Sequence, residues 1–349
     1  MKAYRNLFGN ITSKETLFIA WEEFRKGKQA RKDVQEFERR LEQNLFALHR
    51  ELATGTYRHK PYSAFTICDP KQRRIHKASV RDRILHHAVF SVLNPVFEPT
   101  FIAHSFSCQK GKGTHKAVNA LDRMLRSVSR NGTRSCFVLK CDVHQFFASV
   151  NHDTLLGIIE RRVKDEKTIT LLREIIGSFV AKDSDLFGRK GIPIGNLTSQ
   201  LFANIYLKEF DQFIKHTLKL RHYVRYTDDF VIVGKSYAEL EAYLAPIKSF
   251  LKDNLYLDLH PHKVTIRKCN QGIDFLGYVL LPHHRMLRTK AKRRMMRKLT
   301  ERIDNCKAGQ IPPESVKQSL QSYLGVLLHA DCHRMSQDLQ NQCWFLLQK

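Results

Sequence analysis

The sequence predicts a mixed α+β protein in which helices surround a small group of strands. Short runs of β-branched and aromatic residues at 137–143 and 222–234 predict strands, and the second run is interrupted by a polar centre. Apolar residues at helical spacing over 13–52 predict helices before these strands. Similar spacing over 315–328 and 332–347 predicts helices after them. We therefore expect a central sheet with helices packed around it.

The polar centre of the 222–234 run is Tyr226-Thr227-Asp228-Asp229, which predicts a hairpin whose turn exposes two adjacent carboxylates. Adjacent carboxylates repel each other, and burying them is costly unless a cation compensates, so this turn favours a hard divalent metal. Asp142 follows the apolar run that begins at Phe137. If the two strand ends converge, their acids could hold two metal ions about 4 Å apart, as in-line nucleotidyl transfer requires.

Composition points to a polyanionic partner. The 349 residues include 59 Lys+Arg and 34 Asp+Glu, so the formal net charge is +25. Nucleic acid is the first candidate for such a partner, and an acidic membrane surface or protein is the second. Because no apolar run approaches the ~18 residues of a membrane span, we expect no membrane-embedded segment.

The cysteine pattern predicts free thiols in a reducing cytoplasm. The eight cysteines lack C-x-x-C spacing, and the residues that follow Met1 lack the apolar core of a signal peptide. Structural burial is therefore favoured over zinc binding. These residues are Cys68, Cys108, Cys136, Cys141, Cys269, Cys306, Cys332 and Cys343.

The segments before the first strand-rich region predict a helical lid and a basic hairpin. Ser13 is a plausible helix start, and a helical lid on the main domain is favoured here over a catalytic role. Residues 65–68 predict a strand, Asp69-Pro70 a turn and residues 71–75 a basic return strand. Lys71, Arg73 and Arg74 at the tip could clamp a triphosphate, although basic hairpin tips are also common solvated surfaces.

Other segments suggest contacts with a nucleic acid or a nucleotide. Lys110 and Lys112 lie between glycines without the spacing of a nucleotide-hydrolysing P-loop, but they could approach a template phosphate. Phe147 follows Asp142 closely, and its ring is either part of the core or a steric barrier to a sugar 2′-hydroxyl. Residues 191–207 predict a loop leading into a helix, for which Asn196, Thr198 or Ser199 could serve as the N-cap.

Taken in order, these segments resemble the palm motifs of reverse transcriptases over about residues 10–300. The resemblance is carried by Asp142 with Phe147, Gly195 with Ser199, the Tyr226-Thr227-Asp228-Asp229 box and Phe275-Leu276-Gly277. Most members of the family have Gln-Gly-x-x-x-Ser-Pro as the third motif, whereas residues 194–200 are Ile-Gly-Asn-Leu-Thr-Ser-Gln. This departure resembles the reverse transcriptases of diversity-generating retroelements, which copy a template RNA with frequent errors opposite adenine.

The resemblance implies a right-hand polymerase fold made of fingers, an antiparallel palm sheet with helices, and a helical thumb. We expect an N-terminal helical extension at 1–55, fingers at 56–135 and a palm at 136–284. A helical insertion is expected at about 154–190 within the palm. The thumb, expected at 285–349, begins with a strongly basic helical run.

The resemblance also implies roles at the catalytic centre. Asp142, Asp228 and Asp229 resemble the ligands of two Mg²⁺ ions, with Asp229 the more peripheral. Lys263 corresponds to a lysine proposed to protonate the leaving pyrophosphate, and a structural or phosphate-binding role is an equal alternative. Phe147 matches the residue that selects deoxynucleotides.

A further set of residues is implied in binding the incoming deoxynucleoside triphosphate. Lys71 and Arg73 match the fingers residues that hold it, with Arg74 as a neighbour. Gly195 and Gln200 belong to the third motif beside it. Ile194 occupies the position usually filled by Gln, and it cannot form the same hydrogen bond. Looser positioning of the base pair is the expected physical route to infidelity.

The template–primer duplex is expected to run along the palm and the thumb. Phe275, Leu276 and Gly277 resemble the hairpin that grips the primer end. In the basic run, the arginines expected to track the duplex backbone are Arg293, Arg294 and Arg297. A solvated helix face or a membrane-surface helix is the alternative for this run.

The expected function is RNA-directed DNA synthesis for mutagenic retrohoming, in the cytoplasm. The implied partners are the template RNA, the RNA–DNA duplex, deoxynucleoside triphosphates and a small basic helical accessory variability protein. One alternative is a reverse transcriptase of a retron, group II intron or phage-defence system, which the Ser199-Gln200 ending argues against. A second is a non-catalytic RNA-binding protein, which the retention of all three acids argues against.

Overall fold

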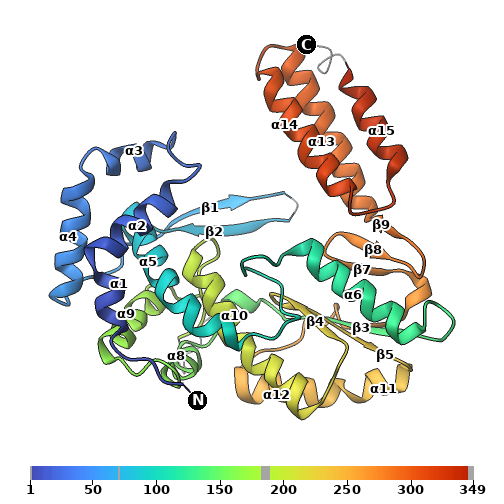
Figure 1. Cartoon of the computed structure of the whole chain (residues 1–349), viewed down its shortest axis with the longest axis horizontal. Coiled ribbons are helices and arrows are strands. Elements are labelled where there is room, and N and C mark those ends of the chain that lie inside the picture. The colour runs from blue at the N-terminus through green and yellow to red at the C-terminus, as the bar shows by residue number, and fades with distance from the viewer. Residues whose placement is uncertain (1, 70, 182–188, 345–349) are drawn as a thin grey trace.

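The computed structural model of the chain describes residues 2–69, 71–181 and 189–344 (Figure 1). The expectations for Pro70 in the first hairpin, for residues 182–188 of the insertion and for residues 345–349 lie outside the described residues, as does Met1. The mixed helix-and-sheet class predicted from the sequence is confirmed.

The N-terminal region is helical, as predicted. The apolar faces of its helices form one core together with a longer helix at residues 80–97. Ser13 caps the second helix by accepting a hydrogen bond from the Thr16 amide at 3.1 Å. Leu17, Trp21 and Phe24 of that helix are buried against the following helices. These elements are α1 (Leu7–Thr12), α2 (Lys14–Arg25), α3 (Lys32–Glu38), α4 (Leu41–Ala53) and α5 (Val80–Phe97).

The predicted basic hairpin is formed by β1 (Ser63–Ile67) and β2 (Arg73–Lys77), which are antiparallel with Ile67 opposite Arg73. It extends away from α5 toward the middle of the molecule in Figure 1. Every residue of β1 is exposed. The hairpin is therefore an arm rather than part of the core.

The central sheet has the strand order β4-β5-β3-β6, and all neighbouring strands are antiparallel. Its strands are β3 (Phe137–Asp142), β4 (Tyr223–Tyr226), β5 (Asp229–Gly234) and β6 (Thr265–Lys268). Alternate side chains of β3 enter different cores: Leu139 and Cys141 join the core of the N-terminal helices, whereas Val138 joins a second core. The strand that ends at Asp142 is therefore anchored on both faces.

Helices cover both faces of this sheet. The bounds are α6 (Thr114–Ser129), α7 (Phe146–Ser149), α8 (His152–Glu160), α9 (Glu166–Gly177), α10 (Leu197–Gln212), α11 (Tyr237–Ala242) and α12 (Leu244–Leu255). Short 3-10 helices span Glu98–Thr100 and Cys269–Gln271, and a π-helix spans Phe213–Thr217. α6 was expected within the fingers at 56–135, but Val118 and Leu121 share a core with Val224 and Val231 of the sheet. The apolar face of α6 therefore packs on the central sheet.

A second sheet and the last helices form the C-terminal end of the described chain. The sheet contains β7 (Ile273–Phe275), β8 (Tyr278–Leu280) and β9 (Arg285–Leu287) in that order. β9 was expected to lie in the thumb, but it pairs with β8 and the helices begin at Thr289. The helices, grouped together in Figure 1, are α13 (Thr289–Lys307), α14 (Pro313–Leu327) and α15 (His333–Gln342).

The eight cysteines are free, as expected. Five of them are buried, but Cys68 and Cys108 are exposed, so the expected structural burial does not hold for these two. None of the helices described is both long and apolar enough to cross a membrane.

Candidate active site

The predicted convergence of acidic residues occurs at the end of the central sheet. Asp142 at the end of β3 lies opposite Asp229 at the start of β5. The amide of Val143 donates to the carbonyl oxygen of Asp228 at 3.3 Å. Residues that are far apart in the sequence therefore form one acidic corner, as the strand pattern predicted.

The electrostatics of this corner show a shortage of positive charge. Burial, reinforced by repulsion from Asp142, raises the pKa of Asp228 above its ordinary value. Burial also raises the pKa of Asp229, and attraction from Lys140 offsets only part of that shift. Lys263 Nζ lies 3.0 Å from Asp142 Oδ1 and neutralises part of the charge. A divalent cation would supply what these lysines do not.

The carboxylates fit Mg²⁺ as an open site rather than a closed cage. Across the described residues, no group of three His, Cys, Asp or Glu side chains could hold a metal ion by itself. Mg²⁺ is usually held by one or two carboxylates together with substrate phosphates, so Asp142 and Asp228 suffice as a donor set. Asp229 is attracted chiefly by Lys140, whose Nζ donates to the carbonyl of Asp274 at 2.9 Å. The peripheral role expected for Asp229 stays a prediction.

The turn that carries Asp228 depends on residues that the sequence analysis did not select. Thr227 has φ +54°, which is unusual for a β-branched residue. Arg225 Nη1 donates to the Thr227 carbonyl at 3.0 Å, and the same guanidinium forms an ion pair with Asp211. The sequence did contain one signal for this interaction. Arg225 is a charged residue within the apolar strand 223–226, and a buried Arg requires an acidic partner.

Arg73 and Arg74 of the basic hairpin belong to opposite faces. Arg73 is close enough to Asp228 to favour its ionised form electrostatically. Because side chains alternate along a strand, Arg74 shares the face of His76, whose ring packs on Phe179 with centroids 4.6 Å apart. Arg74 was expected beside the triphosphate site as a neighbour of Arg73, and that role stays a prediction. Lys71 is exposed before β2.

The third-motif loop is held against the same hairpin. Ile194 is half-buried, and its carbonyl accepts from the His76 amide at 3.1 Å. Asn196 occupies the N-cap position of α10, but its Nδ2 donates to the His76 carbonyl at 3.1 Å instead of its side chain capping the helix. Gly195 has φ +114°, and a Cβ there would lie 2.8 Å from Ile75 Cγ2. Only glycine therefore allows the loop and the hairpin to approach this closely.

Beside this loop lies a cavity of about 290 Å³ whose wall includes Ile75, Gly195 and Gln200. Gln200 is exposed on the first turn of α10. Phe147 is half-buried in α7, and its carbonyl accepts from the Ile192 amide at 2.7 Å. The structure thus brings Phe147 and the third-motif loop to adjoining backbone segments next to the acidic corner.

The residues expected at a primer or template differ in their exposure. Phe275 is 0% exposed in the second core, so its side chain does not reach a primer. Leu276 and Gly277, with φ +50° and +90°, form the tight turn between β7 and β8. Lys112 was expected at a template phosphate, but its Nζ donates to backbone carbonyls at 3.2, 3.2 and 2.8 Å. The Lys112 ammonium therefore binds the backbone of the loop and is not available for a phosphate. Lys110, in contrast, is exposed.

The basic helix α13 faces both solvent and the hairpin arm. Arg293 and Arg297 are exposed, and Arg297 Nη1 lies 3.0 Å from Glu301. Arg294 Nη1 lies 3.9 Å from Asp69, which also forms an ion pair with Lys298. The tip of the β1–β2 arm and α13 are thus joined by charge.

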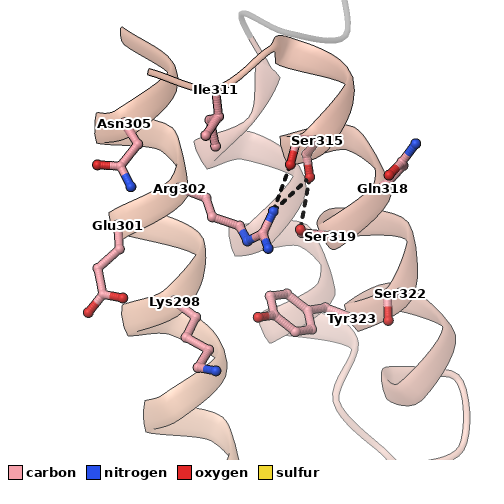
Figure 2. Close-up of a pocket in the computed structure, with 10 residues that line it drawn as sticks. All are labelled: Lys298, Glu301, Arg302, Asn305, Ile311, Ser315, Gln318, Ser319, Ser322 and Tyr323. Carbon is pink, nitrogen blue, oxygen red and sulfur yellow. Dashed lines mark hydrogen bonds between the residues drawn. The ribbon is translucent and has the colours of Figure 1, made fainter. Parts of the chain in front are cut away.

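A cavity of about 700 Å³ lies between α13 and α14, on the helices that follow the second sheet (Figure 2). Arg302 crosses it and donates to the carbonyl and the hydroxyl of Ser315 at 3.3 and 2.8 Å. Ser319 Oγ also donates to the Ser315 carbonyl, at 2.9 Å. The acidic corner does not line this cavity, which is a polar feature of the helices themselves.

Comparisons with known proteins agree with this geometry. Residues 60–280 match the family described as Reverse transcriptase (RNA-dependent DNA polymerase). Protein YkfC of Escherichia coli is 28% identical over 296 residues, which cover 74% of this chain and 75% of that protein. The group II intron-encoded protein LtrA of Lactococcus lactis is 22% identical over 305 residues, covering 68% of this chain and 49% of LtrA.

A solved structure of telomerase from Candida albicans, in complex with a fragment of telomeric RNA, is similar with a TM-score of 0.48 and 13% identity. The match covers 81% of this chain and 55% of that one.

Proposed function

The chain belongs to the reverse transcriptase family of RNA-dependent DNA polymerases, and on this premise we propose that it copies RNA into cDNA with Asp142 and Asp228 as its principal metal ligands. The observation that carries this proposal is the meeting of these two acids at the open end of the central sheet. We assign the β1–β2 arm to the fingers, the central sheet to the palm and α13–α15 to the thumb.

Each part of the site would act on a different part of the substrate. Asp142 and Asp228 would hold two Mg²⁺ ions, whose chemistry would be activation of the primer 3′-hydroxyl and compensation of charge on the leaving pyrophosphate. Lys71 and Arg73 orient the triphosphate, Phe147 closes the space beside the sugar, and Gly195 and Gln200 line the space for the base pair. We propose that Lys263 holds or protonates the pyrophosphate, and its ion pair with Asp142 supports this proposal.

Primer extension tests the proposal directly. Purified protein, an RNA template with an annealed DNA primer, deoxynucleoside triphosphates and Mg²⁺ should yield cDNA. EDTA should abolish extension. A folded wild-type protein that extends no primer under these conditions would exclude the activity and leave the RNA-binding alternative.

We propose further that the enzyme is of the diversity-generating retroelement type. The support is the third motif, in which Ile194 replaces the usual Gln and Gln200 follows Ser199. Ile194 has an apolar side chain where an amide would bind, so the base pair is held less firmly. Sequencing of the cDNA should reveal substitutions concentrated opposite template adenines, and an even error spectrum would reject this subtype.

A group II intron-like enzyme is the second candidate, and similarity to the group II intron-encoded protein LtrA favours it. The two candidates differ in their error spectrum and in the genes beside them. A template repeat next to a variable gene copy that differs at adenines would identify a diversity-generating element. An intron ribonucleoprotein with accurate cDNA would identify the alternative.

The proposed partners follow from the subtype and from charge. The exposed Arg293 and Arg297, in a chain of net charge +25, support tracking of an RNA–DNA duplex by the thumb. Lys110, Leu276 and Gly277 remain proposed contacts with the template or primer. We also propose a small basic helical accessory variability protein, cytoplasmic location and mutagenic retrohoming; affinity purification with the neighbouring gene products would test the accessory partner.

A further inference from the structure

The turn that carries Asp228 rests on a buried ion pair that the roles above do not use. Arg225 is 1% exposed and Asp211, on α10, is 0% exposed. Arg225 Nε donates to Asp211 Oδ1 at 2.8 Å, and Nη2 donates to Oδ2 at 2.6 Å. Tyr223 also donates its hydroxyl proton to Asp211 Oδ1, at 2.8 Å. The pair is thus bidentate and supported by a third group, which is the geometry that a buried pair requires.

The remaining donors of Arg225 reach the catalytic turn and its neighbour. Nη1 donates to the Thr227 carbonyl at 3.0 Å, and Nη2 donates to Ser105 Oγ at 3.0 Å. Thr227 Oγ1 in turn donates to Ser107 Oγ at 2.6 Å. Thr227 has φ +54°, and such a conformation persists only where the surroundings hold it. These bonds therefore hold the strained residue immediately before Asp228.

The segment that receives these bonds is itself fixed from two sides. Lys112 Nζ donates to the Ser105 carbonyl at 2.8 Å, which explains why this lysine is not free for a template phosphate. Asn204 on α10 donates to the Ser107 carbonyl at 2.9 Å. The main chains also join, because the Arg225 amide donates to the His104 carbonyl at 3.0 Å. The turn is therefore connected to a rigid frame rather than to a free loop.

We propose that Arg225, oriented by Asp211, is a positioning residue that holds the Thr227 carbonyl so that Asp228 is presented beside Asp142. This inference rests on the proposed function, because it concerns the placement of a metal ligand. A misplacement of about 1 Å can cost about 100-fold in rate even when the altered residue does not touch the reacting atoms. Arg225 is suited to the task because one planar guanidinium spans the carboxylate, the hydroxyl and the carbonyl at once.

Arg225→Lys tests the proposal while keeping the charge opposite Asp211. A lysine ammonium is a point charge and cannot span Asp211 and the Thr227 carbonyl together. We expect kcat for primer extension to fall about 100-fold, with KM for the template–primer unchanged. Binding of Mn²⁺, measured by electron paramagnetic resonance without nucleotide, should weaken about tenfold or more. Wild-type kcat and Mn²⁺ affinity in this variant would overturn the proposal.

A second substitution separates positioning from simple support of the fold. Asn adopts the left-handed conformation of residue 227 more readily than Thr does, so Thr227→Asn should restore part of the kcat and Mn²⁺ affinity lost in Arg225→Lys. A purely structural ion pair predicts no such recovery, and failure to recover would reject the positioning role.

If Arg225→Lys does not fold, Thr227→Val provides the test. This substitution removes the bond to Ser107 and should lower kcat about tenfold, while unchanged kcat would count against the proposal.

The control is Arg161→Met, which removes the pair between Arg161 Nη1 and Glu209 Oε2 at 2.7 Å. Glu209 lies on α10 as Asp211 does, but this pair is on the surface and away from the turn. Its loss should leave kcat and Mn²⁺ affinity unchanged. If wild-type protein makes no cDNA, the proposed function fails, whereas Mn²⁺ binding by wild type and Arg225→Lys still tests the placement of the turn.

Discussion

Two hairpins contribute to the site, and they differ in how firmly they are held. The residues of β1 are all exposed, and those of β2 are exposed or half-buried. β4 and β5 are buried except at the turn between them. The buried hairpin carries Asp228, which must meet Asp142 in a fixed place, whereas the exposed arm carries Arg73, whose proposed ligand enters and leaves. The more deeply buried hairpin is thus the one that carries the proposed metal ligand.

The largest effect is expected when the carboxylate of Asp228 is removed from the turn of the buried hairpin. Asp228→Ala should reduce primer extension by at least about 10³-fold, because the lost metal contact supplies roughly 4 kcal/mol or more of transition-state stabilisation. The thermal midpoint should stay unchanged or rise, since a buried carboxylate repelled by Asp142 is removed. Steady-state extension and a thermal melt measure both. Normal extension by a folded variant would dismantle the site assignment.

The same truncation on the exposed arm should give a smaller and different effect. Arg73→Ala should raise KM for the triphosphate about 10- to 100-fold, because charged hydrogen bonds are worth about 1.5–3 kcal/mol. Its thermal midpoint should not change, as the side chain is exposed. Arg74→Ala is the matched control on the opposite face of β2 and should leave KM near wild type. Equal losses in both variants would contradict the assignment of faces.

A third substitution tests the contact between the arm and the third-motif loop. Gly195→Ala places a methyl group 2.8 Å from Ile75 Cγ2 on a residue with φ +114°. Strain of about 1–3 kcal/mol should displace the loop or the arm. We expect a higher KM for the triphosphate, together with a lower thermal midpoint. Gly309→Ala, in a turn of φ +71° with open space around it, controls for backbone strain alone; an equal KM change there would argue against the contact.

The smallest effect is expected where the β1–β2 arm meets α13. Asp69→Asn removes the ion pairs with Arg294 and Lys298, which are exposed and worth about 0–1 kcal/mol. Stability should therefore hardly change. Release of the two cations should tighten binding of an RNA–DNA duplex slightly at low salt, as measured by fluorescence anisotropy. Weaker duplex binding would contradict this expectation.

The sequence was sufficient where the signal was local. The apolar run before Asp142 and the two runs around Asp228 predicted strands whose pairing then brought the acids together. The function of Lys112 was not predictable, because it depends on carbonyls whose position only the folded loop determines. The face on which Arg74 lies follows from the alternation of side chains along β2, whose bounds the sequence did not define.

The pairing of Arg225 with Asp211 could not be predicted from the sequence either, because it joins a strand to a helix through tertiary packing. An arginine within an apolar strand signals that some acid must lie nearby, but not which one. Helix α6 illustrates the same limit for larger elements. It lies within the range expected for the fingers, and only tertiary packing determines that its apolar face covers the central sheet.

The strand β3 sends alternate side chains into the two hydrophobic cores, and it ends at Asp142. Looser packing in either core would therefore displace the backbone of β3 and, with it, the carboxylate of Asp142. We expect heat inactivation of synthesis to coincide with cooperative melting, whichever half of the molecule is weakened first. In such an enzyme, neither core can unfold while the other half of the molecule continues to synthesise cDNA.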